Sequence, residues 1–148
     1  MNILIANKDD EKRIRELVIE MLQYVYQKED VTSYEDGYFD RFFSNKEDRI
    51  FVAKDDIVVA FISVEVHHDE LDYIYLDDFI VTKDYRNLGI GHSLMLEVFK
   101  YAKELGINSI VLHVEKTNAK AFNFYTNLGF SIFKDDNTRL LLEKKMEN

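Results

Sequence analysis

The chain has 148 residues with no cysteine, and 19 Lys and Arg against 28 Asp and Glu give it a formal net charge of −9. Its length suits one domain with a hydrophobic core, and its 47% hydrophobic residues exclude a largely disordered chain. The acidic balance argues against a nucleic-acid-binding surface, and the lack of cysteine excludes disulfides and cysteine-based metal sites. We expect a single domain over residues 1–148, in a reducing cytoplasm, with no nucleic acid, membrane or metal partner.

The first part of the sequence predicts a short strand followed by two helices. Residues 3–6 favour a strand, and residues 7–10 carry the acidic groups that begin a helix. Six apolar residues of that helix recur at three- and four-residue spacing, which places them on one buried face. They are Ile14, Leu17, Val18, Met21, Leu22 and Val25. Residues 29–48 are acidic and aromatic, and they predict a loop with a short second helix.

Three runs rich in β-branched residues predict strands that follow one another as a meander. They are residues 50–54, 57–66 and 73–82. Asp55 and Asp56 predict a tight turn between the first two strands, and residues 67–71 predict the next turn.

The rest of the chain alternates between helices and strands. Helical spacing runs from Ile90 to Leu105 and ends at Gly106, which tolerates a positive φ. A strand, a further helix and a final strand pair follow, over residues 109–114, 118–128, 130–133 and 139–144. The order β-α-α-β-β-β-α-β-α-β-β predicts an α/β (α+β) fold with a mixed sheet, in which the parallel crossover is confined to residues 73–114.

A strand that runs into two glycines at the start of an amphipathic helix is typical of an anion-binding loop. Gly89 and Gly91 have no Cβ, so the backbone can approach a ligand closely, and the first N–H groups of the helix have no partner within it. A pyrophosphate would satisfy these groups. Leu94 stands where a dinucleotide fingerprint needs a third glycine, and the Gly-Lys-Ser/Thr of nucleotide hydrolases is absent, so neither motif fits.

The pattern Arg86-x-x-Gly89-x-Gly91 after an apolar strand resembles the acetyl-coenzyme-A motif of the GNAT superfamily of N-acetyltransferases. Residues 112–130 resemble the second motif of that family, in which a strand is followed by Asn, Ala, an aromatic-Tyr pair and Gly-Phe. The resemblance covers residues 73–133. It implies the GNAT fold, a central mixed twisted sheet of about six to seven strands flanked by four helices, with a splayed pair of parallel strands.

Two positions depart from the pattern of this family. Lys83 stands where many members have proline, and Asn87 stands where many have glycine. Neither change removes a needed hydrogen-bond donor, and asparagine tolerates unusual backbone angles. We therefore expect the anion-binding loop to survive both substitutions.

The resemblance implies acetyl-CoA as a co-substrate, bound between the two splayed strands. The backbone of residues 79–81 would pair with the pantetheine arm, and an N–H there would stabilise the oxyanion that forms from the thioester carbonyl. Asn118 and Lys120 would lie near the far end of the cofactor, where Asn118 also fits as a helix cap. The implied cofactor-binding residues are Phe79, Ile80, Val81, Arg86, Asn87, Leu88, Gly89, Ile90, Gly91, His92, Asn118 and Lys120.

The resemblance also implies a catalytic tyrosine and a carboxylate base. Tyr125 stands where the family has a general acid that protonates the departing thiolate; without that role it is a core aromatic residue with a satisfied hydroxyl. Asp77 and Asp78 are consecutive in an expected buried strand and point to opposite faces, so packing does not explain both. Residues 76–81 resemble the spermidine/spermine acetyltransferase branch, which places Asp77 at that branch's Glu. Asp77 is therefore the better candidate for the base, acting through a bridging water because its side chain is one methylene shorter.

The histidines are expected to carry little of this chemistry. His67 and His68 are neighbours at an expected turn, which fits surface residues better than a metal or base pair. His92 and His113 are assigned structural roles, although His92 at a helix start is placed to touch a phosphate.

The resemblance implies an enzyme that moves an acetyl group from acetyl-CoA to a primary amine by direct attack. The loop between the first two helices adds an acidic and aromatic wall, which favours a small cationic acceptor such as a polyamine, a diamine or an amino-acid-like amine. Its carboxylates are Glu29, Asp30, Glu35 and Asp36. Two alternatives stay open, a protein N-acetyltransferase that acts on a peptide α-amine or lysine, and a non-catalytic acyl-CoA-binding regulatory module. The resemblance also suggests a homodimer.

Overall fold

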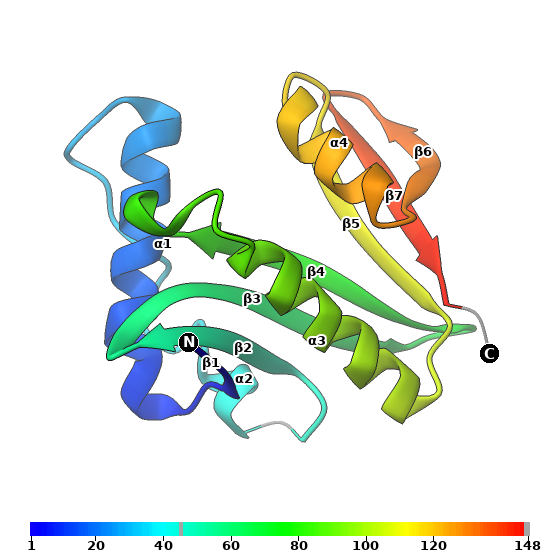
Figure 1. The fold of residues 1–148 in the computed structure, drawn as a ribbon, viewed down its shortest axis with the longest axis horizontal. Coiled ribbons are helices and arrows are strands. Elements are labelled where there is room, and N and C mark those ends of the chain that lie inside the picture. The colour runs from blue at the N-terminus through cyan, green and yellow to red at the C-terminus, as the bar shows by residue number, and fades with distance from the viewer. Residues whose placement is uncertain (45, 147–148) are drawn as a thin grey trace. The chain divides into compact units, whose positions relative to one another are not determined.

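The computed structural model describes residues 1–44 and 46–146, and these fold into seven strands, four α-helices and two single turns of 3-10 helix (Figure 1). The strands are β1 (Asn2–Ile5), β2 (Arg49–Asp55), β3 (Ile57–His68), β4 (Asp72–Val81), β5 (Ser109–Glu115), β6 (Ser131–Asp136) and β7 (Arg139–Lys145). The α-helices are α1 (Glu11–Tyr26), α2 (Asp40–Ser44), α3 (Ile90–Leu105) and α4 (Ala119–Asn127). The 3-10 turns are η1 (Lys8–Asp10) and η2 (Lys83–Tyr85). The predicted order of elements is confirmed.

The strands are hydrogen-bonded in the order β1-β2-β3-β4-β5-β7-β6. β1 with β2, β2 with β3, β5 with β7 and β6 with β7 are antiparallel, whereas β4 and β5 are parallel, so the predicted mixed sheet is confirmed. The parallel register joins three residue pairs, Ile74 to Ile110, Tyr75 to Val111 and Leu76 to Leu112. β4 itself continues past Leu76 to Val81.

Two compact units can be distinguished along the chain. Unit 1 contains residues 1–64 and 78–98, and unit 2 contains residues 65–77 and the chain from Phe99 onward. β3, β4 and α3 each continue from one unit into the other. The expectation of a single domain over residues 1–148 stays a prediction.

The core of unit 1 is built around the apolar face of α1. Ile14, Leu17 and Val18 are fully buried there, in one cluster with side chains from β2, β3 and β4. Asn7 and Asp10 form a capping box ahead of the helix, which explains its start. Val25 was expected on the buried face but is 58% exposed, because it lies in the last turn of α1, beyond the cluster.

In unit 2, hydrogen bonds fix both ends of α4. The side chain of Asn118 caps α4 by accepting a hydrogen bond from the N–H of Ala121 at 3.1 Å. Beyond the helix, Gly129 has a φ of 98°, and Lys144 Nζ donates to the carbonyl of Leu128 at 2.9 Å. The chain reversal after α4 is thus fixed by a left-handed glycine and by a cation on β7.

One expected turn is wrong in its bounds. His67 and His68 belong to β3, which extends to His68, so the reversal falls on the three residues that follow. His67 stacks on Tyr73 with ring centroids 4.8 Å apart, and His68 Nδ1 lies 2.9 Å from Asp72 Oδ1. These contacts between β3 and the start of β4 prolong the strand where the local sequence favours a turn.

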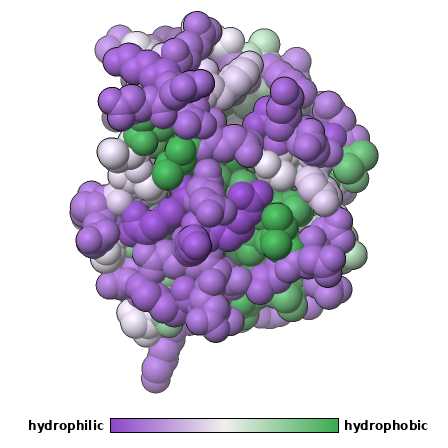
Figure 2. Space-filling model, turned by 90° about the vertical axis from the view of Figure 1, so that its left-hand side faces the viewer, coloured by the Kyte–Doolittle hydropathy of each residue, from purple (hydrophilic) through white to green (hydrophobic). Residues whose placement is uncertain are grey.

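Hydrophilic side chains dominate the face of the molecule drawn in Figure 2, and the hydrophobic patches on it are small and separate. Among residues 1–44 and 46–146, no helix combines the length and the apolar composition that a membrane crossing needs.

Candidate functional site

The loop between β4 and α3, residues 82–89, has the backbone geometry of an anion-binding loop. Asn87 has a φ of 62° and Gly89 a φ of 82°, so two left-handed residues flank Leu88. The expectation that Asn87 tolerates an unusual backbone angle is confirmed. The space where a Cβ of Gly89 would lie is open, since no described residue other than its two chain neighbours has a heavy atom within 4 Å of that position. The backbone at Gly89 is therefore open to a close approach by a ligand.

The first turn of α3 directs backbone N–H groups toward this loop. The N–H of Ser93 donates to the carbonyl of Gly89 at 3.0 Å, which is the first helical bond of α3. The amides of Ile90, Gly91 and His92 precede that bond, so they have no carbonyl four residues earlier within the helix. Ile90 is buried and anchors the turn, whereas His92 is exposed. A hollow of about 270 Å³ lies beside Gly89, Ile90 and Ser93, and its other walls are apolar or aromatic side chains, those of Met1, Ile3, Tyr85 and Leu88. An anionic group fits these donors and the positive end of the helix dipole.

Glu20 of α1 holds the β4–α3 loop in place. Its carboxylate accepts hydrogen bonds from the hydroxyl of Thr82 at 2.7 Å and from the N–H of Lys83 at 3.3 Å. Arg86, an expected cofactor ligand, lies 3.7 Å from the same carboxylate and donates from Nε to the carbonyl of Val81 at 2.9 Å. Sequence reasoning missed Glu20, because nothing in its local pattern separates it from the other acidic residues on the polar side of α1.

The end of β4 combines packing with an expected backbone role. Ile80 is buried in the core of unit 1, and Phe79 and Val81 are half-buried. The N–H of Thr82 donates to the carbonyl of Val59 at 2.9 Å, which ties the end of the strand to β3. The side chains thus pack as in a core strand, and the expected pairing of this backbone with pantetheine stays a prediction.

The two consecutive aspartates of β4 differ in burial. Asp77 is exposed, whereas Asp78 is only 8% exposed. Oδ1 of Asp78 accepts a hydrogen bond from the hydroxyl of Tyr34 at 2.9 Å, and its N–H donates to Ser63 Oγ at 2.9 Å. Burial therefore singles out Asp78, although the sequence favoured Asp77 as the base. The hydrogen bonds of Tyr34 and Ser63 with Asp78 were not predicted from the sequence, because these residues reach Asp78 only through the fold.

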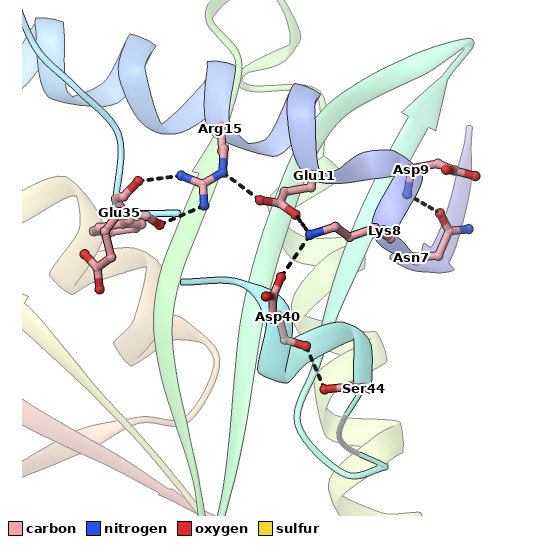
Figure 3. Close-up of polar contacts among 9 residues, drawn as sticks. Asn7, Lys8, Asp9, Glu11, Arg15, Glu35, Asp40 and Ser44 are labelled. Atoms are coloured by element: carbon pink, nitrogen blue, oxygen red, sulfur yellow. Dashed lines mark hydrogen bonds and ion pairs between the residues drawn. The ribbon is translucent and has the colours of Figure 1, made fainter. Parts of the chain in front are cut away.

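The loop that carries Tyr34 is aromatic and held to α1. Tyr34 and Tyr38 stack with ring centroids 3.9 Å apart, and Phe39 packs edge-on against both. Figure 3 shows the guanidinium of Arg15 between Glu11 and this loop, where it donates to the carbonyls of Tyr34 and Glu35. The Glu35 carboxylate points away from Arg15 in the same view. The four carboxylates of the expected acidic wall are all exposed: Glu29, Asp30, Glu35 and Asp36.

Tyr125, the expected general acid, lies on α4 in unit 2 and is half-buried. Its ring meets those of Phe124 and Phe130 edge-on. Burial raises the pKa of Tyr125 to about 12, so the phenol stays protonated at neutral pH, as a hydrogen donor must be. The other expected residues of α4, Asn118 and Lys120, are exposed at its start.

The fold divides the expected site residues between the two units. Unit 1 brings together Asp78, the end of β4 and the loop before α3, and unit 2 carries Asp77, Asn118, Lys120 and Tyr125. Within the described residues, no group of three or more His, Cys, Asp and Glu side chains is placed to hold a metal ion.

Comparison with known proteins identifies relatives of this chain. The model of the Acetyltransferase (GNAT) family matches residues 12–130. A spermidine N(1)-acetyltransferase from Thermoplasma acidophilum is 29% identical over 94 residues, which make up 64% of this chain and 56% of that protein. An L-ornithine N5-acetyltransferase from Arabidopsis thaliana is 34% identical over 61 residues, 41% of this chain and 27% of that protein. The chain thus spans about half the length of the first of these relatives and about a quarter of the second.

Solved structures give the same fold. The PaiA N-acetyltransferase from Thermoplasma acidophilum, crystallised in complex with coenzyme A, aligns with a TM-score of 0.78 and 23% sequence identity. The alignment covers 98% of this chain and 99% of that one. The predicted fold is confirmed, with its seven-stranded mixed sheet, four helices and parallel pair of β4 and β5.

Proposed function

The chain belongs to the GNAT acetyltransferase family, and on that premise we propose that it moves an acetyl group from acetyl-CoA to the primary amine of a small cationic acceptor. The observation that carries the proposal is the loop before α3, where Asn87 and Gly89 are both left-handed and the first amides of the helix follow. This geometry suits a pyrophosphate, and it lies inside the region that matches the family.

This geometry supports the cofactor-binding roles of the proposal. The amides of Ile90, Gly91 and His92, with the backbone of Asn87 and Gly89, bind the pyrophosphate. Arg86 adds positive charge, which matters because the chain as a whole carries −9. When bound, acetyl-CoA supplies the activated acetyl group. The backbone of residues 79–81 lies along the pantetheine arm and donates a hydrogen bond to the thioester carbonyl as negative charge develops on it.

Tyr125 acts as hydrogen donor to the departing thiolate in this proposal. A phenol whose pKa is about 12 is fully protonated at neutral pH. The thiolate is a weaker base than the phenolate of Tyr125, because the ordinary pKa of a thiol is about 8.5. The hydroxyl therefore stabilises the thiolate by hydrogen bonding in the transition state, and the thiolate receives its proton as the acceptor amine releases one.

The acceptor class is supported by charge and by relatives. Exposed carboxylates on the loop after α1 attract cations, and the two relatives described above are a spermidine and an ornithine acetyltransferase by name. An ammonium acceptor must lose a proton before it attacks, because its ordinary pKa is about 10.4. Asp77 or Asp78 is the carboxylate base of the proposal. A homodimer and a cytoplasmic location stay predictions from the sequence.

The test follows free thiol release from acetyl-CoA in the presence of polyamines, diamines, amino acids and short peptides. We expect release with small cationic amines, and a fall in kcat of about 10²-fold or more for Tyr125→Phe. Tyr24→Phe is the matched control, because Tyr24 is 77% exposed and lies on α1. Release only with peptides would identify a protein N-acetyltransferase. Coenzyme A binding without release from any amine would identify an acyl-CoA-binding module.

A further inference from the structure

One face of the sheet in unit 2 is the floor of a cavity of about 700 Å³, a volume within the range of small-molecule sites. β4, β5 and β7 each contribute alternate residues to this floor, and the strand register places them on the same side of the sheet. The floor residues are Tyr73, Tyr75, Ser109, Val111, His113, Leu141, Glu143 and Lys145. All residues that line the cavity belong to unit 2.

The opposite face of the same strands is covered within unit 2. Leu142, which precedes Glu143 on β7, is fully buried. Lys144 points to the covered face as well, because its Nζ donates to the carbonyl of Leu128 after α4 and lies 5.1 Å from the ring centroid of Phe99 on α3. These contacts with α3 and α4 therefore fall on the face opposite the cavity.

Three aromatic rings of the cavity are held in place by their neighbours. The ring of His67 stacks on Tyr73 with centroids 4.8 Å apart. The hydroxyl of Tyr75 lies 2.7 Å from Nδ1 of His113, and Nε2 of His113 lies 2.8 Å from Oδ2 of Asp136. Because these contacts fix the rings of Tyr73, Tyr75 and His113 beforehand, little further ordering is needed when a ligand binds.

Phe133 adds a further ring from the edge strand β6. The pairing of β6 with β7 shifts its register between Ile132 and Lys134, and Phe133 lies at this shift. A bulge of this kind re-aims a side chain. Here Phe133 is 62% exposed and lines the cavity.

The charge that is sheltered in the cavity is negative. The Glu143 side chain is 16% exposed, and its Oε2 accepts a hydrogen bond from Ser109 at 2.6 Å. Asp72 adds a second carboxylate to the wall. Lys145 lies with Nζ 3.9 Å from Glu143, but its side chain is 78% exposed. Water therefore screens the charge of Lys145 more than that of Glu143.

Acidic groups near Tyr73 add to this negative potential. Burial raises the pKa of Tyr73, and the negative charges of Asp69 and Glu65 raise it as well. The phenol of Tyr73 therefore stays neutral and gives the cavity an uncharged aromatic face. The two carboxylates favour a cation over an anion at this end of the cavity.

The cavity suits an ammonium group without N–H bonds. Aromatic faces attract organic cations, and they do so for quaternary ammonium groups in particular. A primary ammonium brings three N–H donors that each need an acceptor, whereas Glu143 already accepts from Ser109 and the floor at Val111 and Leu141 is apolar. A quaternary ammonium has no such donors, and its methyl groups pack against rings and apolar side chains.

We propose that the cavity of unit 2 is a ligand site for a quaternary ammonium group, with Glu143 as its counter-ion and the aromatic side chains of the cavity around it. The inference does not rest on the proposed acetyl transfer, since a quaternary nitrogen has no N–H bond to exchange for an acetyl group. It assigns to unit 2 a ligand of its own.

The first test compares two ligands of the same shape. Choline is the probe, and the control is its neutral analogue in which a carbon atom replaces the nitrogen. Both are titrated into the wild type by calorimetry without acetyl-CoA, and the Cε1–H resonance of His113, assigned by comparison with His113→Gln, is followed by NMR. We expect choline to bind about tenfold more tightly than the analogue and to shift this resonance. Equal affinities for the two ligands, or an unshifted resonance, would overturn the site.

Two variants locate the binding site in the cavity. Glu143→Gln removes the charge but keeps an oxygen that accepts from Ser109, and Phe133→Leu removes the ring but keeps an apolar side chain. We expect each to raise the Kd of choline about threefold or more, with an unchanged circular dichroism spectrum. Glu115→Gln is the matched control, because Glu115 is exposed at the end of β5 and is not among the described residues that line the cavity.

The control separates a specific site from a general attraction of cations to an acidic chain. A Kd for choline that rises as much in Glu115→Gln as in Glu143→Gln would overturn the site, because binding would then follow the net charge alone. Acetyl transfer is measured separately with primary amines, so loss of the choline site would leave the proposed function standing, and choline binding without turnover of any amine would support the site and not the transfer.

Discussion

The hydroxyl of Tyr34 donates to the buried carboxylate of Asp78 at 2.9 Å, although 44 residues separate the two in the sequence. This bond joins the aromatic loop after α1 to β4, next to Phe79, whose backbone is proposed to contact the cofactor. The loop is in turn attached to α1 by Arg15, through the carbonyls of Tyr34 and Glu35. The acidic loop and the strand that carries a candidate base are therefore parts of one connected structure within unit 1.

Tyr34→Phe should destabilise the fold. The change removes a hydrogen bond to a buried carboxyl group, which contributes about 1–3 kcal/mol, and leaves the ring stack with Tyr38 in place. Urea unfolding measures the difference in the free energy of unfolding. Tyr24→Phe is the control, and equal stability of the two variants would contradict a contribution from the bond to Asp78.

Gly89→Ala should weaken coenzyme A binding as well as stability. Gly89 has a φ of 82°, which costs a residue with a Cβ about 1–2 kcal/mol, and the open space around it means that no clash adds to this strain. Gly106→Ala is the matched control, because Gly106 has a φ of 71° and equally open surroundings at the other end of α3. We expect similar losses in urea unfolding, but a raised Kd for coenzyme A by calorimetry only for Gly89→Ala. The same Kd for both variants would separate Gly89 from the cofactor.

Glu20→Ala should raise the Kd of coenzyme A several-fold, because the carboxylate holds the hydroxyl of Thr82 and the N–H of Lys83 in the loop before α3. Glu20→Gln should have a smaller effect, since an amide oxygen still accepts a hydrogen bond and the lost negative charge favours an anionic ligand. Glu16→Ala is the control on the same helix. Glu16 is exposed, and the contact described for it is an ion pair with Arg13 at 3.2 Å. A Kd that is unchanged in Glu20→Ala would show that the loop is ordered without this contact.

Tyr125 should make the protein lose stability at high pH. Its pKa is about 12 when folded and about 10 when unfolded, so the unfolded state releases a proton in a range where the folded state keeps it. Stability from this group is complete below pH 10 and is lost as pH rises toward 12, by an amount on the order of 2–3 kcal/mol. Urea unfolding between pH 9 and 11.5, a range that spans most of this titration, should show a steeper loss for the wild type than for Tyr125→Phe. Parallel curves would contradict the burial of the hydroxyl.

Elements whose limits depend on local chemistry were predictable from the sequence. Gly106 and Gly129 end their helices in the left-handed region, and Asn118 caps α4, as their residue types indicate. Asn87 has the left-handed backbone angle that asparagine tolerates, so this loop could be predicted from the sequence. The prediction from the local sequence was wrong at His67 and His68. The sequence favours a turn there, but contacts with the start of β4 extend β3 to His68.

The sequence by itself determined the order of elements, the position of the left-handed loop before α3 and the family, because periodicity, glycine positions and short motifs are local properties that each segment carries in its own residues. Only the tertiary structure decided which polar side chains meet. Tyr75 reaches His113 across 38 residues and Thr82 reaches Glu20 across 62, and burial separates Asp78 from Asp77 although they are neighbours in one strand. Such contacts depend on strand register and on which face another element covers, and neither leaves a signature in the residues on either side.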